Sequence, residues 1–149
     1  MPYLHLYLHI VFSTKNRFPF LDTPELRRAV WKHIRQNASE KGVFIDFING
    51  YSDHCHILLS LGSEQPLSKT IQLIKGESSF WINKNNLCNQ KFEWQNDYFA
   101  VSASPSAVSK VRNYISTQEE HHKTKTFAEE YDEFIKSVTL HIPSELHKQ

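Results

Sequence analysis

Residues 43–61 read VFIDFINGYSDHCHILLSL, which is two apolar runs joined by a short polar connection. β-Branched and aromatic residues dominate both runs, as is typical of β-strands. We therefore predict strands over 43–51 and 54–61, paired as an antiparallel hairpin because so few residues connect them. Asn49 and Gly50 form a common turn dipeptide and are expected to begin the turn.

The segments around this hairpin alternate between strand and helix patterns. The predicted elements are a strand over 3–13, a helix over 24–41, the hairpin, a helix over 66–81, an irregular stretch over 83–95, a strand over 97–103, a helix from 104 to about 122 and a short helix over 126–137. Thr23 is a suitable cap for the first helix, and Pro24 suits its first position. The second helix is expected to bury a face formed by Leu67, Ile71, Ile74 and Phe80.

The first six elements follow the order strand, helix, strand, strand, helix, strand. This order is the split βαβ pattern of ferredoxin-like folds, an α+β class that includes RRM-like domains. We predict an antiparallel sheet with helices on one face, followed by a C-terminal helix that carries Tyr114. A single domain is expected over 1–149, with a structured core over about 3–137 and a frayed tail over 138–149.

Composition favours a folded domain. The 149 residues are 40% hydrophobic and 22% charged with a net charge of +1, which argues against a disordered chain. Two cysteines cannot build a disulfide framework. Neither a signal peptide nor a membrane-length apolar run is recognisable, so the expected compartment is the cytoplasm. Residues 15–41 carry seven Lys or Arg against three acidic residues, a locally basic stretch.

His54 and His56 flank Cys55 within the second strand of the hairpin. Alternate residues of a strand point to the same face, so the two imidazoles project together, roughly 6–7 Å apart at the backbone. Two imidazoles side by side on a sheet suit a divalent metal ion. The alternative is two histidines on a solvated face, and the spacing alone does not separate the two interpretations.

The helix after residue 104 places Tyr114 and Gln118 four positions apart on one face. Taken alone, this helix is explained by a buried tyrosine beside a glutamine at the solvent edge. Combined with the histidine pair, the carboxamide of Gln118 offers a third ligand, and this mixed donor set suits Mg²⁺ or Mn²⁺ better than a structural zinc. Tyr114 is then a candidate nucleophile towards a phosphate that the metal polarises.

Five segments, in this order, carry a resemblance to a known family. They are LHIVFSTKNR (8–17), DHCHILLSL (53–61), LSKTIQLIKGESSFWIN (67–83), FEWQNDYFAVSAS (92–104) and VRNYISTQEEHH (111–122). Over about residues 3–137 the chain resembles the HUH-type single-tyrosine transposases. These are small insertion-sequence transposases that act on single-stranded DNA, together with their repeat-associated relatives.

The resemblance implies a role for each of these residues. His54 and His56 correspond to the histidines of the family motif, Gln118 matches the third ligand for Mg²⁺ or Mn²⁺, and Tyr114 matches the nucleophile. The implied reaction is transesterification, in which Tyr114 forms a 5′-phosphotyrosine linkage and frees a 3′-hydroxyl that can later rejoin strands. The implied partners are single-stranded DNA hairpins at element ends and a second copy of the chain. Relatives are typically homodimers in which the tyrosine helix of one subunit serves the histidines of the other.

Further residues near these segments are candidates for DNA contacts. Lys15, Arg17 and Lys75 are predicted to face the DNA. Arg27, Arg28 and Arg35 are further candidates for phosphate contacts, although an ordinary solvated helix face explains these three equally well. Asn16 stands where many relatives have an aromatic residue, which concerns the preference for DNA ends. Trp31, Trp81 and Trp94 are candidates for stacking on unpaired bases, although core packing is the commoner role for Trp31 and Trp81. His9 is expected to be a packed strand residue rather than a ligand.

Two other classes of function remain open. One is a related HUH nicking endonuclease that initiates replication, which shares the chemistry and differs in lacking strand transfer. The other is a non-catalytic RRM-like module that binds nucleic acid through aromatic residues on an open sheet face. A metal enzyme acting on a small molecule is disfavoured, because neither a glycine-rich phosphate loop nor a further carboxylate cluster accompanies the histidine pair.

Overall fold

The protein is described from a computed structural model that covers residues 6–121, 126, 128–129 and 132–133. Its chain divides into two compact units, Met1–Gln118 and Glu119–Gln149, and the fold below is that of the first. The expected strand residues 3–5, most of the expected helix over 126–137 and the expected tail lie outside the described residues. A single domain over 1–149 therefore stays a prediction. Within the described part of the chain, no helix is long and apolar enough to cross a membrane.

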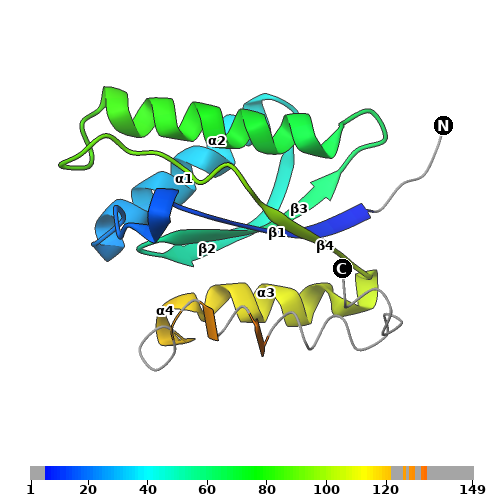
Figure 1. Cartoon of the computed structure of the whole chain (residues 1–149). Helices are drawn as coiled ribbons and strands as arrows, with labels where there is room; N and C mark the ends of the chain where they lie inside the picture. Colours follow the sequence, from blue (N-terminus) through cyan, green and yellow to red (C-terminus); the bar gives the residue numbers. More distant parts are fainter. Residues whose placement is uncertain (1–5, 122–125, 127, 130–131, 134–149) are drawn as a thin grey trace. The chain divides into compact units, whose positions relative to one another are not determined.

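The first unit is built around a four-stranded antiparallel sheet with strand order β2-β3-β1-β4 (Figure 1). Its elements are β1 (Leu6–Ser13), α1 (Pro24–Glu40), β2 (Phe44–Tyr51), β3 (His54–Leu61), α2 (Leu67–Lys84), β4 (Phe99–Ala103) and α3 (Val108–Ser116), with short 3₁₀ turns at Lys15–Arg17 and Pro105–Ala107. The short helix α4 (Gln118–His121) begins at the last residue of this unit. This is the predicted α+β, ferredoxin-like arrangement, and the predicted order of the first six elements is confirmed.

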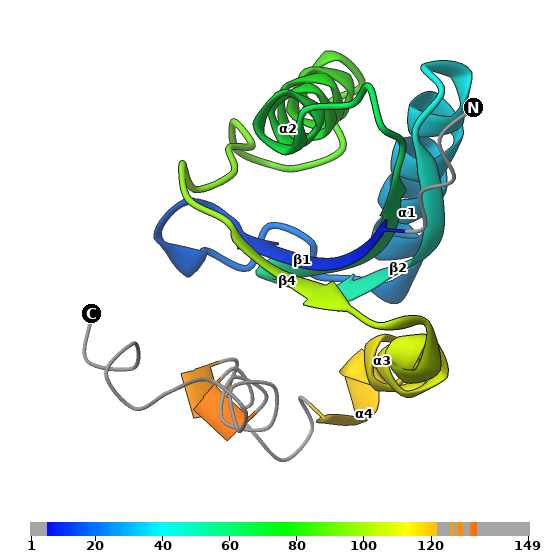
Figure 2. The ribbon, with the colours of Figure 1, turned by 90° about the vertical axis from the view of Figure 1, so that its right-hand side faces the viewer.

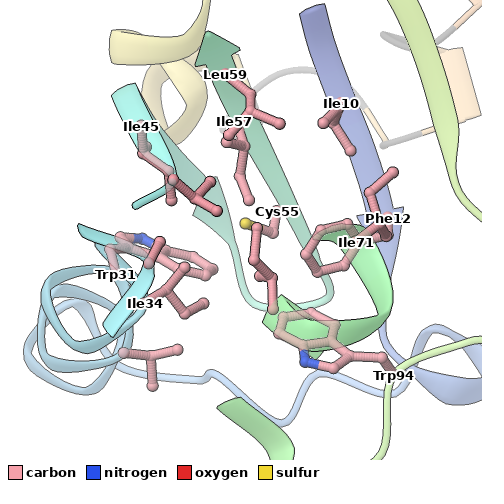
Figure 3. Close-up of a cluster of buried hydrophobic side chains, with 14 of the residues drawn as sticks. Ile10, Phe12, Trp31, Ile34, Ile45, Cys55, Ile57, Leu59, Ile71 and Trp94 are labelled. Atoms are coloured by element: carbon pink, nitrogen blue, oxygen red, sulfur yellow. The ribbon is translucent and has the colours of Figure 1, made fainter. Parts of the chain in front are cut away.

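The two faces of the sheet bury different side chains. Even-numbered β1 residues such as Ile10 and odd-numbered β3 residues such as Ile57 point towards α1 and α2, where they form the main hydrophobic core with Cys55 (Figure 3). The alternate residues point the other way, where Leu58 packs against Val108 and Ile115 of α3. Figure 2 shows α1 and α2 on one side of the sheet and α3 on the other.

Local signals explain where α1 begins and ends. The Thr23 side chain accepts a hydrogen bond of 3.2 Å from the backbone N–H of Leu26, and Pro24 occupies the first helical position. Gly42 follows the helix with φ at +77°, a left-handed conformation that glycine adopts without steric cost. The predicted helix is therefore confirmed to within a residue of its expected end.

The predicted apolar face of α2 is wrong at one position. Phe80 is 63% exposed, whereas Ile71, Ile74 and Ile82 are buried together with Thr70 and Ser78. At 100° per residue, Phe80 lies on the side of the helix opposite to Ile71, so it cannot share the same buried stripe. The helix also continues to Lys84, past the expected end at 81.

The hairpin turn differs from the prediction. Asn49 and Gly50 lie inside β2, opposite His56 and Cys55, and the turn falls at Ser52 and Asp53. Pairing of the two strands up to Tyr51 and His54 leaves only two residues for the connection. Residue type alone favoured the earlier dipeptide, but the register of the strands places the turn directly before His54.

The stretch between α2 and β4 contributes to the core, although its polar composition suggests otherwise. Phe92 and Trp94 are buried, and their rings meet edge to face with centroids 4.7 Å apart. The Trp94 indole N–H donates a 2.9 Å hydrogen bond to the hydroxyl of Ser78. Trp94 is therefore a core residue, and its predicted role in stacking on bases is wrong.

Candidate functional site

The histidine pair lies at the start of β3, directly after the hairpin turn. His54 and His56 point to the α3 side of the sheet, both side chains are buried, and their ring centroids are 5.0 Å apart. Cys55 between them points into the main core (Figure 3), where burial raises the pKa of its thiol. The strand alternation therefore separates two polar site residues from one apolar packing residue.

Each imidazole of the pair has a hydrogen-bonding neighbour. Nδ1 of His54 lies 2.8 Å from the Oδ1 atom of Asp53, the last residue of the turn. Nδ1 of His56 lies 2.9 Å from Nε2 of His9, which is buried on β1. The Nε2 atoms of both motif histidines are thus left on the far sides of the rings from these two neighbours.

α3 is attached to the sheet by apolar packing and by one ion pair. Val108 and Ile115 pack on Leu58 of β3. The Arg112 guanidinium donates two hydrogen bonds, of 2.8 and 2.9 Å, to the carboxylate of Asp46 on β2. This bidentate pairing raises the pKa of Arg112 and fixes the rotation of the helix, because a fork-to-fork contact has one geometry.

The predicted single helix carrying both Tyr114 and Gln118 is wrong. α3 ends at Ser116, and Gln118 begins the short helix α4 after a break at Thr117. The Asn49 side-chain amide donates to the carbonyls of Ile115 and Ser116, at 3.1 and 3.3 Å, which satisfies groups exposed at the end of a helix.

Despite this break, the structure brings both residues to the histidine pair. Oε1 of Gln118 lies 2.9 Å from Nε2 of His54, and Gln118 is fully buried. The Tyr114 ring meets His56 edge-on with centroids 5.7 Å apart, and it meets His9 in the same way at 6.0 Å. Tyr114 and Gln118 therefore both lie beside the histidine pair of their own chain.

The donor set fits a small divalent cation. Neighbouring ligands of an octahedral ion bound at about 2.1 Å lie roughly 3 Å apart, and the His54 nitrogen and Gln118 oxygen have this separation. Among the residues that the structure describes, no cluster of three His, Cys, Asp or Glu side chains could hold a metal ion. A carboxamide is therefore needed to complete a three-ligand set with His54 and His56.

The three predicted DNA-contacting residues lie in two places. Lys15 and Lys75 line a groove of about 570 Å³ beside α2, which we call the α2 groove. Other residues that line it are Gln72, Trp94, Gln95 and Tyr98. Arg17 lies instead beside the hairpin turn, with its Nε 3.7 Å from Oδ2 of Asp53. Arg17 therefore borders the histidine site, and the two lysines do not.

Both lysines of the groove have protein partners. Lys15 forms a 3.0 Å ion pair with Glu93. The Lys75 ammonium donates to the carbonyls of Gln95 and Asp97, and partial burial lowers its pKa. Lys75 therefore ties the 95–97 segment to α2, in addition to any contact with DNA.

Two residues of the site were not predicted from the sequence. Asp53 had no assigned role, and His9 was expected only to pack in its strand. Alternation along β1 puts Tyr7 and His9 on one face of the strand, but the pairing that brings this face beside His56 depends on the register of β1 with β3. His9 and His56 are 47 positions apart, and the register between their strands is a tertiary property. The sequence could therefore indicate only which face of β1 carries His9, and not that His9 meets His56.

The fold and the site define a class: a ferredoxin-like domain with a histidine pair on its central sheet and a tyrosine helix packed against it. Comparison with known proteins gives the family, because the IS200-like transposase family matches residues 3–118. This chain belongs to that family.

Two relatives and two solved structures are similar to the chain. The transposases for insertion sequence element IS200 of Salmonella typhimurium and Salmonella typhi are each 30% identical over 120 residues, covering 77% of this chain and 78% of theirs. The crystal structure of a candidate transposase from Deinococcus radiodurans R1 aligns with a TM-score of 0.63 at 20% identity, covering 78% of this chain and 93% of that one. The structure of a REP-associated tyrosine transposase bound to a REP hairpin aligns with a TM-score of 0.61 at 14% identity, covering 82% of this chain and 72% of that one.

Proposed function

We propose that the protein cleaves and rejoins single-stranded DNA at the ends of a mobile element, with Tyr114 as the nucleophile. The Tyr114 oxygen forms a bond to the scissile phosphorus while the bond from phosphorus to the 3′ oxygen breaks. The phenol loses its proton and the departing 3′ oxygen gains one. The products are a 5′-phosphotyrosine linkage and a free 3′-hydroxyl, and attack of such a hydroxyl on the linkage rejoins strands.

The single observation that carries this proposal is the meeting of four side chains from three elements. His54 and His56 come from β3, Tyr114 comes from α3, and Gln118 is the first residue of α4. The contacts of Gln118 with His54 and of Tyr114 with His56 join residues about 60 positions apart in the chain. Core packing alone does not require a buried carboxamide beside a buried imidazole, since each polar group is costly to desolvate.

His54, His56 and Gln118 are the residues that would hold Mg²⁺ or Mn²⁺. When bound, such an ion supplies charge stabilisation to the phosphate under attack. The contribution of the chain itself is to orient His54 through Asp53 and to keep the Tyr114 ring against His56. Orientation of this kind lowers the entropic cost of bringing the reacting groups together.

The competing RRM-like interpretation is disfavoured by the position of α3. A module that stacks bases on its sheet needs an open face, but α3 contacts β2 and β3 on the face that carries the histidines. Aromatic residues such as Phe47 on that face are packed against the α3 cluster. A nicking endonuclease shares the proposed chemistry, and strand-transfer assays with paired element ends distinguish it from a transposase.

The Tyr114→Phe variant tests the nucleophile. We expect loss of the covalent protein–DNA adduct, because the phenol oxygen is the atom that attacks, with hairpin binding largely retained. The measurement uses labelled single-stranded oligonucleotides from the DNA flanking the gene, incubated with Mg²⁺ and separated on a denaturing gel. Asn113→Ala is the control, since Asn113 is an exposed residue of the same helix α3 and should leave the adduct intact. An adduct that persists in Tyr114→Phe contradicts the proposal.

We further propose that the α2 groove holds part of the DNA hairpin. Lys15 is more than half exposed there, and the amides of Gln72 and Gln95 line the same hollow. In such a groove the lysine ammonium can bind a phosphate, while the amide groups can form hydrogen bonds with the edges of bases. A homodimer and recognition of hairpins at element ends remain predictions.

Lys15→Ala tests the groove. Because each phosphate contact releases counterions, the slope of log K against log salt should fall by about 0.7–0.9. The slope is measured by fluorescence anisotropy with a labelled hairpin at several salt concentrations. Lys32→Ala on the exposed side of α1 is the control and should leave the slope unchanged. An unchanged slope in Lys15→Ala would place the DNA elsewhere.

A further inference from the structure

His9 is a buried polar residue that the proposed chemistry does not use. It lies on β1 between Val101 of β4 and Leu58 of β3, so its strand neighbours are apolar. Its Nε2 is 2.9 Å from Nδ1 of His56, and the two rings lie edge to edge with centroids 5.1 Å apart and an interplanar angle of 28°. The side chain is only 1% exposed. A buried imidazole in this position needs a reason, because hydrophobic side chains fill such sites at lower cost.

A hydrogen bond between two neutral imidazoles has a direction. One nitrogen must carry the proton and donate, and the other must accept through its lone pair. If His56 donates from Nδ1, its Nε2 has a lone pair and can bind a metal ion. If His9 donates instead, the proton of His56 is on Nε2 and that nitrogen cannot be a ligand. The His9–His56 contact therefore couples the tautomer of the two rings.

We infer that His9 is a positioning residue that holds His56 in the tautomer with its proton on Nδ1. In this arrangement His56 Nδ1–H donates to Nε2 of His9, and the lone pair of His56 Nε2 points away from that bond into the site. The inference rests on the proposed function, because the lone pair matters only if His56 is a metal ligand. His9 plays for His56 the part that a carboxylate or carbonyl plays for many metal-binding histidines.

The edge-to-edge geometry strengthens this constraint. Two buried, nearly coplanar rings carried on paired strands have little freedom to turn, so the nitrogen facing His9 stays the same. The Tyr114 ring meets both imidazoles edge-on and closes another side of the pair. Without the His9 acceptor, His56 should therefore populate both neutral tautomers and more than one ring orientation.

The first test is spectroscopic and needs neither DNA nor a metal ion. Protein with ¹⁵N-labelled histidine is studied by long-range ¹H–¹⁵N correlation, which distinguishes the two neutral tautomers, and His56→Gln assigns the His56 signals. We expect the Nδ1–H tautomer at His56 in the metal-free wild type, and a mixture of tautomers in His9→Leu. A wild-type His56 with its proton on Nε2 would overturn the inference.

The second test measures Mn²⁺ affinity by electron paramagnetic resonance. His9→Leu should weaken binding by about 10–100-fold, as expected for removal of a partner of a metal ligand. His9→Gln should retain most of the affinity, because its Oε1 can reach the position of Nε2 and accept the same hydrogen bond. His9→Asn should behave like His9→Leu, because its shorter side chain places the amide near the position of Nδ1.

Controls separate the possible failures. His33→Leu removes a histidine that pairs with Glu77 between α1 and α2, and it should leave Mn²⁺ affinity unchanged. A folded His9→Leu protein with wild-type affinity would overturn the inference while leaving the proposed function intact. If His9→Leu does not fold, equal Mn²⁺ affinities of His9→Gln and His9→Asn would likewise overturn the inference. A wild type that fails to bind Mn²⁺ counts against the proposed function, and the tautomer measurement still decides the role of His9.

Discussion

Asp53 shows how a single turn residue can organise the site. Its carboxylate lies 2.8 Å from His54 Nδ1, and its backbone carbonyl accepts a 2.8 Å hydrogen bond from the N–H of Thr14. Arg17 lies on its outer side at 3.7 Å. A carboxylate in this position fixes the orientation of an imidazole ligand. Asp53 thereby connects the end of β1 with the first histidine of the pair.

Replacing Asp53 by Ala should weaken Mn²⁺ binding by about 10–100-fold, because His54 loses the partner that sets its ring orientation. Isothermal titration calorimetry with Mn²⁺ measures the affinity, and a thermal melt monitored by circular dichroism shows whether the fold is kept. Asp22→Ala is the matched control, since Asp22 is an exposed carboxylate just before α1. Equal losses in both variants would mean that net charge, and not the contact with His54, sets the affinity.

At the scale of the elements, the close packing of the hairpin against α1 depends on Gly50. A Cβ atom at this position would lie 2.2 Å from the carbonyl oxygen of His54 and 3.0 Å from a ring carbon of Trp31. The clash with the carbonyl involves the backbone of β3 itself, which cannot rotate away. The glycine therefore allows the strand that carries the histidines to approach β2 and α1 closely.

Gly50→Ala should destabilise the protein by about 1–3 kcal/mol, the usual cost of overpacking a core. Gly76→Ala is the opposite case, because nothing lies within 4 Å of an added Cβ in the middle of α2. This control should stabilise the protein by about 0.5–1 kcal/mol through helix propensity. Urea denaturation measures both values. A neutral Gly50→Ala would show that β2 and β3 can separate at this point.

The attachment of α3 also depends on β2. Asp46 holds Arg112 near the middle of the helix, and Asn49 binds the carbonyls at its end. Two polar contacts from one strand thus set both the rotation and the length of the helix. Gln118 follows this end by two residues, so the position at which α3 stops decides whether the carboxamide reaches His54.

At the scale of the whole molecule, the sheet separates packing from chemistry. The main core fills the side of α1 and α2, and the histidine site lies on the α3 side. The α2 groove belongs to the core side, and Arg17 lies at the edge where the two sides meet.

A mixing experiment tests whether one chain forms a complete site. We expect that a mixture of His56→Ala and Tyr114→Phe proteins forms no more adduct than either alone, because Tyr114 contacts the histidine pair of its own chain. Each variant mixed with wild type is the control and should show only the wild-type contribution. Restored adduct in the double mixture would show that tyrosine and histidines come from different subunits.

Several features of this protein follow from local sequence patterns. Strand alternation puts His54 and His56 on one face and Cys55 on the other whatever the rest of the chain does. The cap of α1 likewise depends on adjacent residues, as Thr23 and Pro24 show. For the same reason, the order of strands and helices predicted the ferredoxin-like sheet, since each element was recognisable from its own residues.

Other features arise only when distant segments meet. The break at Thr117 depends on Asn49 of β2, the contact of His9 with His56 depends on strand register, and the burial of Trp94 depends on Ser78 of α2. These contacts join residues 16 to 67 positions apart. Periodicity and propensity describe residues within a few positions of one another. They therefore cannot predict contacts between distant residues that the folded sheet brings together. The residue types of the candidate site could therefore be predicted from the sequence, whereas tertiary packing decided that these residues come together.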